Sequence, residues 1–149
     1  MNRKWTVFGL AAGVLVTLSV ASLSTADDKK HGELEEIMEK VQKHSGVLKK
    51  NTRTPVAYKK AQKDIEASAL ELAKLAKKIK PMKDALKKAK DEANPGAKWE
   101  EFSEHLFKAS EAMAKVVSKA DSTQAEAKKA LAPVNRSCAD CHAVFKVEE

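Results

Sequence analysis

Apolar residues recur at three- and four-residue steps along four stretches of the chain, a spacing that places them on one side of an α-helix. The first stretch runs from Leu34 to Leu48 and the second from Tyr58 to Ile79. The third runs from Trp99 to Ala120 and the fourth from Ala127 to Phe145. The pattern predicts four helices of roughly 20 residues, each about 30 Å long.

Polar breaks between these stretches supply signals for helix starts. Thr54 followed by Pro55 suits an N-cap with proline in the first turn. Thr123, with Glu126 three residues later, is typical of a capping box at the start of the fourth helix. Between the second and third helices, Asn94–Gly96 reads as a turn.

Two prolines complicate the helix boundaries. Pro81 is expected to end or kink the second helix, and Met82–Lys90 could form an extra helical piece. Pro133 lies inside the fourth pattern and lacks the N–H that would bond to the carbonyl of Lys129, so we expect a kink or a later helix start there. Short connections favour antiparallel neighbours. The predicted fold is an all-α, antiparallel up-down four-helix bundle.

The N-terminus has the three parts of a secretory signal peptide. Two basic residues precede an apolar run over Val7–Val20, and the small residues Ser24–Ala26 follow at the positions that a signal peptidase reads. The run is shorter than the roughly 20 residues of a membrane span. We predict a signal peptide over residues 1–26, export to the periplasm without a stable membrane anchor, and a single domain over residues 27–149. An uncleaved N-terminal anchor is the alternative.

Composition narrows the class of protein. The chain of 149 residues has 28 Lys+Arg, 21 Asp+Glu and two cysteines. Two cysteines exclude a multi-disulfide scaffold and a four-thiolate zinc site. The basic residues mostly fall between the apolar positions, which indicates a solvated surface. Basic clusters interleaved with exposed aromatics are missing, so we do not expect nucleic-acid binding.

Both cysteines lie in one motif near the C-terminus. Cys138 and Cys141 are followed directly by His142, which gives C-x-x-C-H, the attachment pattern of c-type haem. Residues three apart on a helix share a face, so two thiols there can form thioethers to the two vinyl groups of one porphyrin. The adjacent imidazole can then turn onto the iron as its proximal ligand. The motif predicts one covalently bound haem c.

Other roles for the motif fit less well. A thioredoxin-like pair belongs near a strand–helix junction, and this chain reads as all-helical. A disulfide between the two cysteines would leave the adjacent histidine without a role, although a haem-free helical interaction protein stays an alternative. A zinc site would need two more ligands. The remaining histidines are scattered along the chain at His31, His44 and His105.

An exported four-helix chain with C-x-x-C-H close to its end resembles the class II cytochromes c, which include the cytochrome c′ and cytochrome c-556 types. The resemblance covers residues 30–147. Phe145 and Lys146 match the aromatic and basic residues that commonly follow the family's histidine. His44–Gly46 matches a His-x-Gly near the end of the family's first helix.

The resemblance implies a candidate for the sixth iron ligand. Met38 stands six residues before His44, at the position that faces the distal side of the haem in the family. In the c-556 branch a methionine there binds iron, whereas in the c′ branch an apolar residue usually leaves the iron five-coordinate. On the residues alone, a methionine on an apolar stripe is most often packing. His31 is a reserve ligand.

We therefore predict an exported, soluble, monohaem electron carrier, not an enzyme, with His142 and Met38 as iron ligands. Its basic surface would steer it to acidic redox partner proteins. The alternative is a five-coordinate, cytochrome c′-like protein that binds NO or CO, with Ile37 and Val41 as an apolar distal wall. Members of the resembled family can dimerise through their first two helices, so a homodimer is an open alternative.

Overall fold

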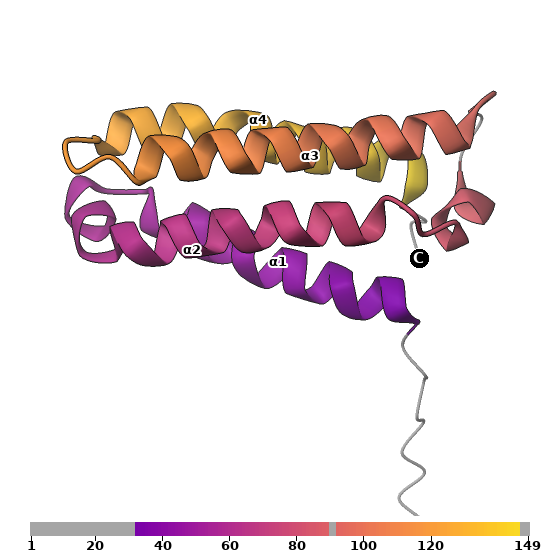
Figure 1. Cartoon of the computed structure of the whole chain (residues 1–149), viewed down its shortest axis with the longest axis horizontal. Coiled ribbons are helices and arrows are strands. Elements are labelled where there is room, and N and C mark those ends of the chain that lie inside the picture. Colours follow the sequence, from indigo (N-terminus) through magenta and orange to yellow (C-terminus); the bar gives the residue numbers. More distant parts are fainter. Residues whose placement is uncertain (1–31, 90–91, 147–149) are drawn as a thin grey trace, which may run out of the picture.

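The computed structural model describes residues 32–89 and 92–146, and four α-helices contain most of them (Figure 1). The helices are α1 (Glu33–Asn51), α2 (Pro55–Ile79), α3 (Pro95–Val117) and α4 (Gln124–Phe145). Each helix runs antiparallel to the one before it (Figure 1), and the described residues contain no strand. The predicted all-α, up-down four-helix bundle is confirmed. The predicted signal peptide over residues 1–26 lies outside the described residues.

Two helix starts form as their sequence signals predict. The Thr54 hydroxyl accepts a hydrogen bond from the backbone N–H of Ala57 at 3.2 Å and caps α2. The Thr123 hydroxyl accepts from the N–H of Glu126 at 3.3 Å, while the Glu126 carboxylate accepts from the N–H of Thr123 at 2.8 Å. This reciprocal pair is the predicted capping box, so the start of α4 is fixed by local side chains.

The connection between α2 and α3 differs from the expectation. Pro95 and Gly96, predicted as a turn, belong to the first turn of α3. Asn94 alone stays outside the helix, and its side chain accepts from the N–H of Ala97 at 3.2 Å. The helical piece expected from Met82 to Lys90 is a five-residue 3₁₀-helix, η1 (Asp84–Lys88).

Helix α4 passes through Pro133 without a break, so the later helix start considered there is wrong. The capping box starts the helix nine residues earlier, and the buried side chains of Leu131 and Val134 hold this turn against the core. A real departure from helical geometry lies in α2 instead. Ala61 has φ −116° and ψ 17°, and no proline or glycine marks it in the sequence.

The core contains apolar side chains from the inward faces of all four helices. Its largest fully buried side chains are Leu48, Ile65, Leu72, Trp99, Met113, Val117 and Val134. The Trp99 indole donates to the carbonyl of Ile79 at 2.9 Å, and the ring centroids of Trp99 and Phe145 lie 5.1 Å apart in a T-shaped arrangement. This cluster ties the C-terminal end of α4 to α2 and α3. None of the described helices has the length and apolar character of a membrane span.

The four helices are not packed equally. Helix α2 packs along α1 and α3, and α3 packs along α4, whereas α1 and α4 have little direct contact. Figure 1 shows α1 diverging from the other helices towards its N-terminal end. At its other end, the Gln124 amide of α4 donates to the Thr52 carbonyl at 2.7 Å. We call the facing sides of these two helices the α1–α4 seam.

Candidate cofactor-binding site

The C-x-x-C-H motif lies in the C-terminal half of α4, with every residue in helical conformation. Cys138 and Cys141 are half-buried, and both thiols are free. His142 is exposed, so it does not belong to the buried apolar stripe of α4. The reason is helical geometry, because consecutive residues point about 100° apart and His142 cannot share the face of Cys141.

His142 lies on the side of α4 that faces α1. Gln124 marks this side, because its amide reaches the end of α1. Asn135 and His142 follow Gln124 by 11 and 18 residues, which are about three and five whole turns. The histidine of the motif therefore borders the α1–α4 seam.

Met38 borders the same seam from the other helix. The Lys49 ammonium acts electrostatically on the Cys138 thiol, so the Lys49 side of α1 faces α4. Met38 precedes Lys49 by 11 residues, about three turns, and shares that side. The hydrogen bond between Gln124 and Thr52 serves as a common reference point for the two helices. Met38 precedes Thr52 by 14 residues along α1, and Cys138 follows Gln124 by 14 residues along α4. Both are about 21 Å from this bond, so they stand at the same height.

Packing and hydrogen bonding are incomplete at this height of the seam. Leu34, Met38, Cys138 and Cys141 touch the core but are only partly buried. The Asn135 Oδ1 atom is buried and has no hydrogen-bond partner among the described residues. A buried carbonyl oxygen without a donor is costly. Two free thiols, an imidazole, uncovered apolar side chains and an unpaired polar atom together fit the haem that the motif predicts.

Both thiols of the motif have raised pKa values. Burial raises the pKa of Cys138, and the nearby Lys49 charge offsets only part of that effect. Burial, with a smaller contribution from Cys138, raises the pKa of Cys141 to about 11. A reactive thioredoxin-like cysteine needs a lowered pKa. The arrangement therefore argues against a dithiol redox centre.

The pKa shift of the His142 imidazole favours its neutral form. Partial burial, and secondarily the charge of Lys146, lowers the pKa of His142 below its ordinary value of 6.5. A neutral imidazole is the form that coordinates a metal. Within residues 32–89 and 92–146, no three His, Cys, Asp or Glu side chains are grouped so that they could hold a metal ion.

The other histidines do not join the motif. The pKa of Glu71 on α2 is lowered chiefly by its hydrogen bond with Lys74 and to a smaller extent by His44 on α1, which places the half-buried His44 towards α2 rather than the seam. Its Nδ1 atom is buried without a partner among the described residues. His105 is exposed on α3. His31, the reserve ligand, lies outside the described residues.

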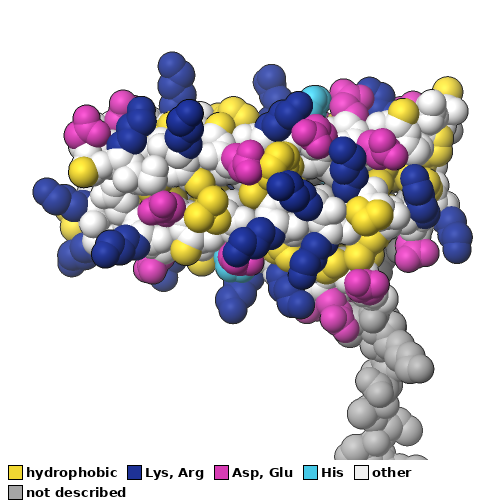
Figure 2. Space-filling model, in the orientation of Figure 1, with side chains coloured by type: hydrophobic (Ala, Val, Ile, Leu, Met, Phe, Trp, Pro, Cys, Tyr) yellow, Lys and Arg dark blue, Asp and Glu magenta, His cyan; other side chains and the backbone are white. Residues whose placement is uncertain are grey.

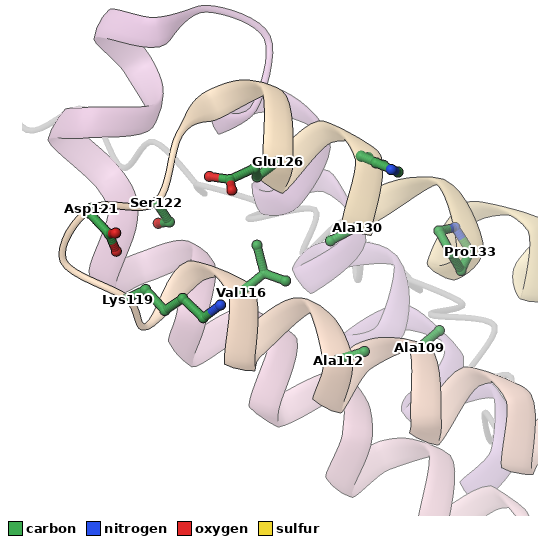
Figure 3. Close-up of a pocket in the computed structure, with 10 residues that line it drawn as sticks. Ala109, Ala112, Val116, Lys119, Asp121, Ser122, Glu126, Ala130 and Pro133 are labelled. Carbon is green, nitrogen blue, oxygen red and sulfur yellow. The ribbon is translucent and has the colours of Figure 1, made fainter.

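Two surface hollows lie away from the motif. One, of about 530 Å³, lies between α1 and α2. The other, of about 410 Å³, is a groove between α3 and α4 (Figure 3). Its floor consists of the small side chains Ala109, Ala112, Ala130 and Pro133, and charged side chains stand at one end. Neither hollow includes a motif residue, so the candidate site is defined by the seam and its side chains.

Motif reasoning misses Asn135. It belongs to no haem signature, and its unpaired oxygen is visible only once α4 is packed in the bundle. The signal available in the sequence is its position seven residues before His142, which is about two helical turns.

Comparison with protein families finds a match to the family described as Cytochrome C', over residues 32–146. Comparison with curated proteins and with solved structures finds no match. The matched range includes all four helices and the complete motif. It leaves out the N-terminal segment that we predict to be a signal peptide.

Proposed function

The chain belongs to the cytochrome c′ family, and on this premise we propose that it is an exported electron carrier with one covalently attached haem c. The family implies a haem-binding protein rather than an enzyme. The observation that supports the electron-carrier role is that Met38 and Cys138 lie at the same height along the bundle, on facing sides of the α1–α4 seam.

We assign attachment to the two cysteines. Cys138 and Cys141 would each add sulfur and hydrogen across one vinyl group, which converts two thiols into two thioethers without an oxidant. Both thiols stay protonated at neutral pH, because burial raises their pKa values. His142 would be the proximal ligand through its neutral imidazole. When bound, haem c supplies a one-electron iron couple whose potential its axial ligands set.

Met38 is the proposed distal ligand. Side chains on an α-helix lean towards its N-terminus. Because α1 and α4 are antiparallel, Met38 leans towards the height of His142, and His142 leans back towards the height of Cys138. The thioether and the imidazole thus approach a common height between the two helices. A His/Met ligand pair raises the reduction potential, which suits an electron carrier.

An open distal site is the second candidate function, and the description of the matched family favours it. In this alternative Met38 stays a packing residue, and the protein binds NO or CO. Ile37 and Val41, which are 6% and 8% exposed, would form the apolar distal wall.

Visible spectra of the haem-loaded protein and of Met38→Ala distinguish the two. If Met38 binds iron, the wild type is low-spin in both oxidation states, and Met38→Ala becomes high-spin and binds CO readily. Met113→Ala is the matched control, because this methionine is fully buried in the core and should leave the spin state unchanged. A high-spin wild type that takes up CO would support the gas-binding alternative.

The haem-free alternative has its own outcome. Expression of the precursor in a host with haem-attachment machinery should give a covalent Soret band. If no such band forms, both haem proposals are wrong, and a helical interaction protein is left.

A further inference from the structure

Charge is distributed unevenly along the bundle. One half, residues 41–66 and 107–134, contains the α1–α2 turn and the α3–α4 loop. It carries 12 Lys/Arg and 5 Asp/Glu. The rest of the described chain carries 11 of each. A net charge of +7 therefore lies in the loop half, and the described residues of the half with the C-x-x-C-H motif carry no net charge.

The positive charge of the loop half is accessible and largely uncompensated. All 12 basic side chains are exposed. Among the described residues, Lys108 is the one member of this set within ion-pair distance of a carboxylate, and its partner Glu104 belongs to the other half. One of the five acids, Glu126, accepts hydrogen bonds from the N–H and hydroxyl of Thr123 and also interacts electrostatically with Lys119.

An exposed apolar side chain lies among these cations. Val56 is 66% exposed, the highest value among the large hydrophobic side chains of the described residues. Arg53, Lys59 and Lys60 stand three or four residues from it, so the two lysines share its side of α2. We call Lys50, Arg53, Val56, Lys59, Lys60 and Lys119 the loop-end patch. Figure 2 shows Lys and Arg side chains projecting at this end of the bundle, on its left.

We propose that the loop-end patch binds the surface of an anionic lipid bilayer. Eleven of the 12 basic residues of the loop half are lysines, which are depleted at protein interfaces but attract anionic headgroups as point charges. Val56 supplies the apolar contact that complements cations at a membrane interface.

The patch and the motif are well separated. The bond between Gln124 and Thr52 marks the loop end, and Cys138 lies about 21 Å further along α4. A bundle docked by this end would hold its neutral, motif-bearing half away from the bilayer and open to other partners. The inference goes beyond the proposed electron transfer, because it depends on the helical surface and not on the state of the iron.

Co-sedimentation of the haem-loaded protein with lipid vesicles tests the proposal. The probes are phosphatidylcholine vesicles with and without a minor fraction of phosphatidylglycerol. We expect binding only to the anionic vesicles, and its loss at high salt, where the Debye length falls to about 3 Å. Arg53→Glu/Lys59→Glu/Lys60→Glu should weaken this binding at least about a hundredfold.

The matched control is Lys40→Glu/Lys78→Glu/Lys87→Glu. These exposed lysines lie in the other half, and the triple variant has the same net charge as the patch variant. It should bind within about threefold of wild type, and Val56→Ser, which alters no charge, should bind severalfold more weakly than wild type. Circular dichroism and the visible spectrum check that each variant is folded and loaded.

Three results would overturn the proposal. An equal loss of vesicle binding in the control triple variant would mean that binding depends on net charge alone and not on the loop-end patch. Equal binding to uncharged vesicles would point to the apolar N-terminal segment. Binding to an acidic protein column but not to anionic vesicles would assign the patch to a protein partner. A failure of haem ligation would appear in the visible spectrum and leave vesicle binding intact, so the two proposals fail separately.

Discussion

Helix α4 packs closely against α3 but only incompletely against α1. On one side α3 packs along it, and Met113, Val117 and Val134 are all fully buried. On the other side the seam with α1 leaves Cys138 half-buried and His142 exposed. The same helix is therefore closed against α3 and open towards α1.

The difference shows how stability and chemistry are divided in this bundle. The side of α4 that packs on α3 needs apolar side chains at helical spacing, and one apolar residue type of similar size can replace another there. The open side holds side chains whose chemistry is specific: two thiols, an imidazole and a thioether. Substitutions on the two sides of α4 should therefore act on different observables.

The largest expected effect is the loss of covalent haem when the cysteines on the open side of α4 are replaced. Cys138→Ala/Cys141→Ala removes both thiols, so no haem should remain bound after acid–acetone extraction. Each single variant should keep one thioether and show a shifted α band, because one vinyl group stays conjugated. Extracted protein and pyridine haemochrome spectra measure both results. A double variant that retains covalent haem would contradict the assignment of these cysteines.

The next effect tests the closed side. Met113→Ala leaves a cavity in a fully buried position and should lower the free energy of unfolding by about 2–5 kcal/mol. Its visible spectrum should match wild type. Met38→Ala, at a half-buried position, should cost less stability in the haem-free protein while it changes the spin state. Urea unfolding of both variants measures the losses. Equal losses would contradict the idea that the closed side of α4 serves stability and the open side serves chemistry.

A third prediction concerns the proline that α4 tolerates. Pro133→Ala restores an N–H that can donate to the Lys129 carbonyl, so it should raise the free energy of unfolding by about 1–3 kcal/mol. Pro55→Ala is the matched control. This proline stands at the first position of α2, where no intrahelical bond is missing, and its replacement should be nearly neutral. Thermal unfolding of both variants measures the contrast. Destabilisation by Pro133→Ala would mean that its ring packing outweighs the missing bond.

The smallest effect is an acid dependence at the start of α4. Hydrogen bonds from the backbone N–H and hydroxyl of Thr123 hold the pKa of Glu126 below its ordinary value of 4.5. As pH falls, the unfolded chain takes up this proton first. The stabilisation is therefore present above about pH 4.5 and is lost as pH falls through the lower, folded value. In Glu126→Gln this part of the acid sensitivity should disappear.

Unfolding in urea at neutral and at acid pH measures this dependence. Glu111→Gln, at an exposed carboxylate that caps no helix, is the control and should unfold with the acid sensitivity of wild type. An unchanged pH dependence in Glu126→Gln would show that protonation of Glu126 in the capping box does not affect the free energy of unfolding.

The sequence predicted the parts of the fold that depend on near neighbours. The cap of Thr54 on α2 and the capping box of Thr123 act within one helical turn, so the residues alone specify them. The apolar stripes specify the four helices in the same way. The C-x-x-C-H motif is local too, so the sequence alone predicts a haem protein.

The sequence by itself thus determined the helices, their caps and the attachment motif, because each depends on contacts between residues close along the chain. Only the tertiary structure decided that α4 closes against α3 and stays open towards α1. It also turned His142 to the seam, left the Asn135 oxygen unpaired and gathered the uncompensated cations at one end. These features depend on how residues from distant parts of the chain pack together, and helical periodicity alone does not encode which pair of faces is left without a partner.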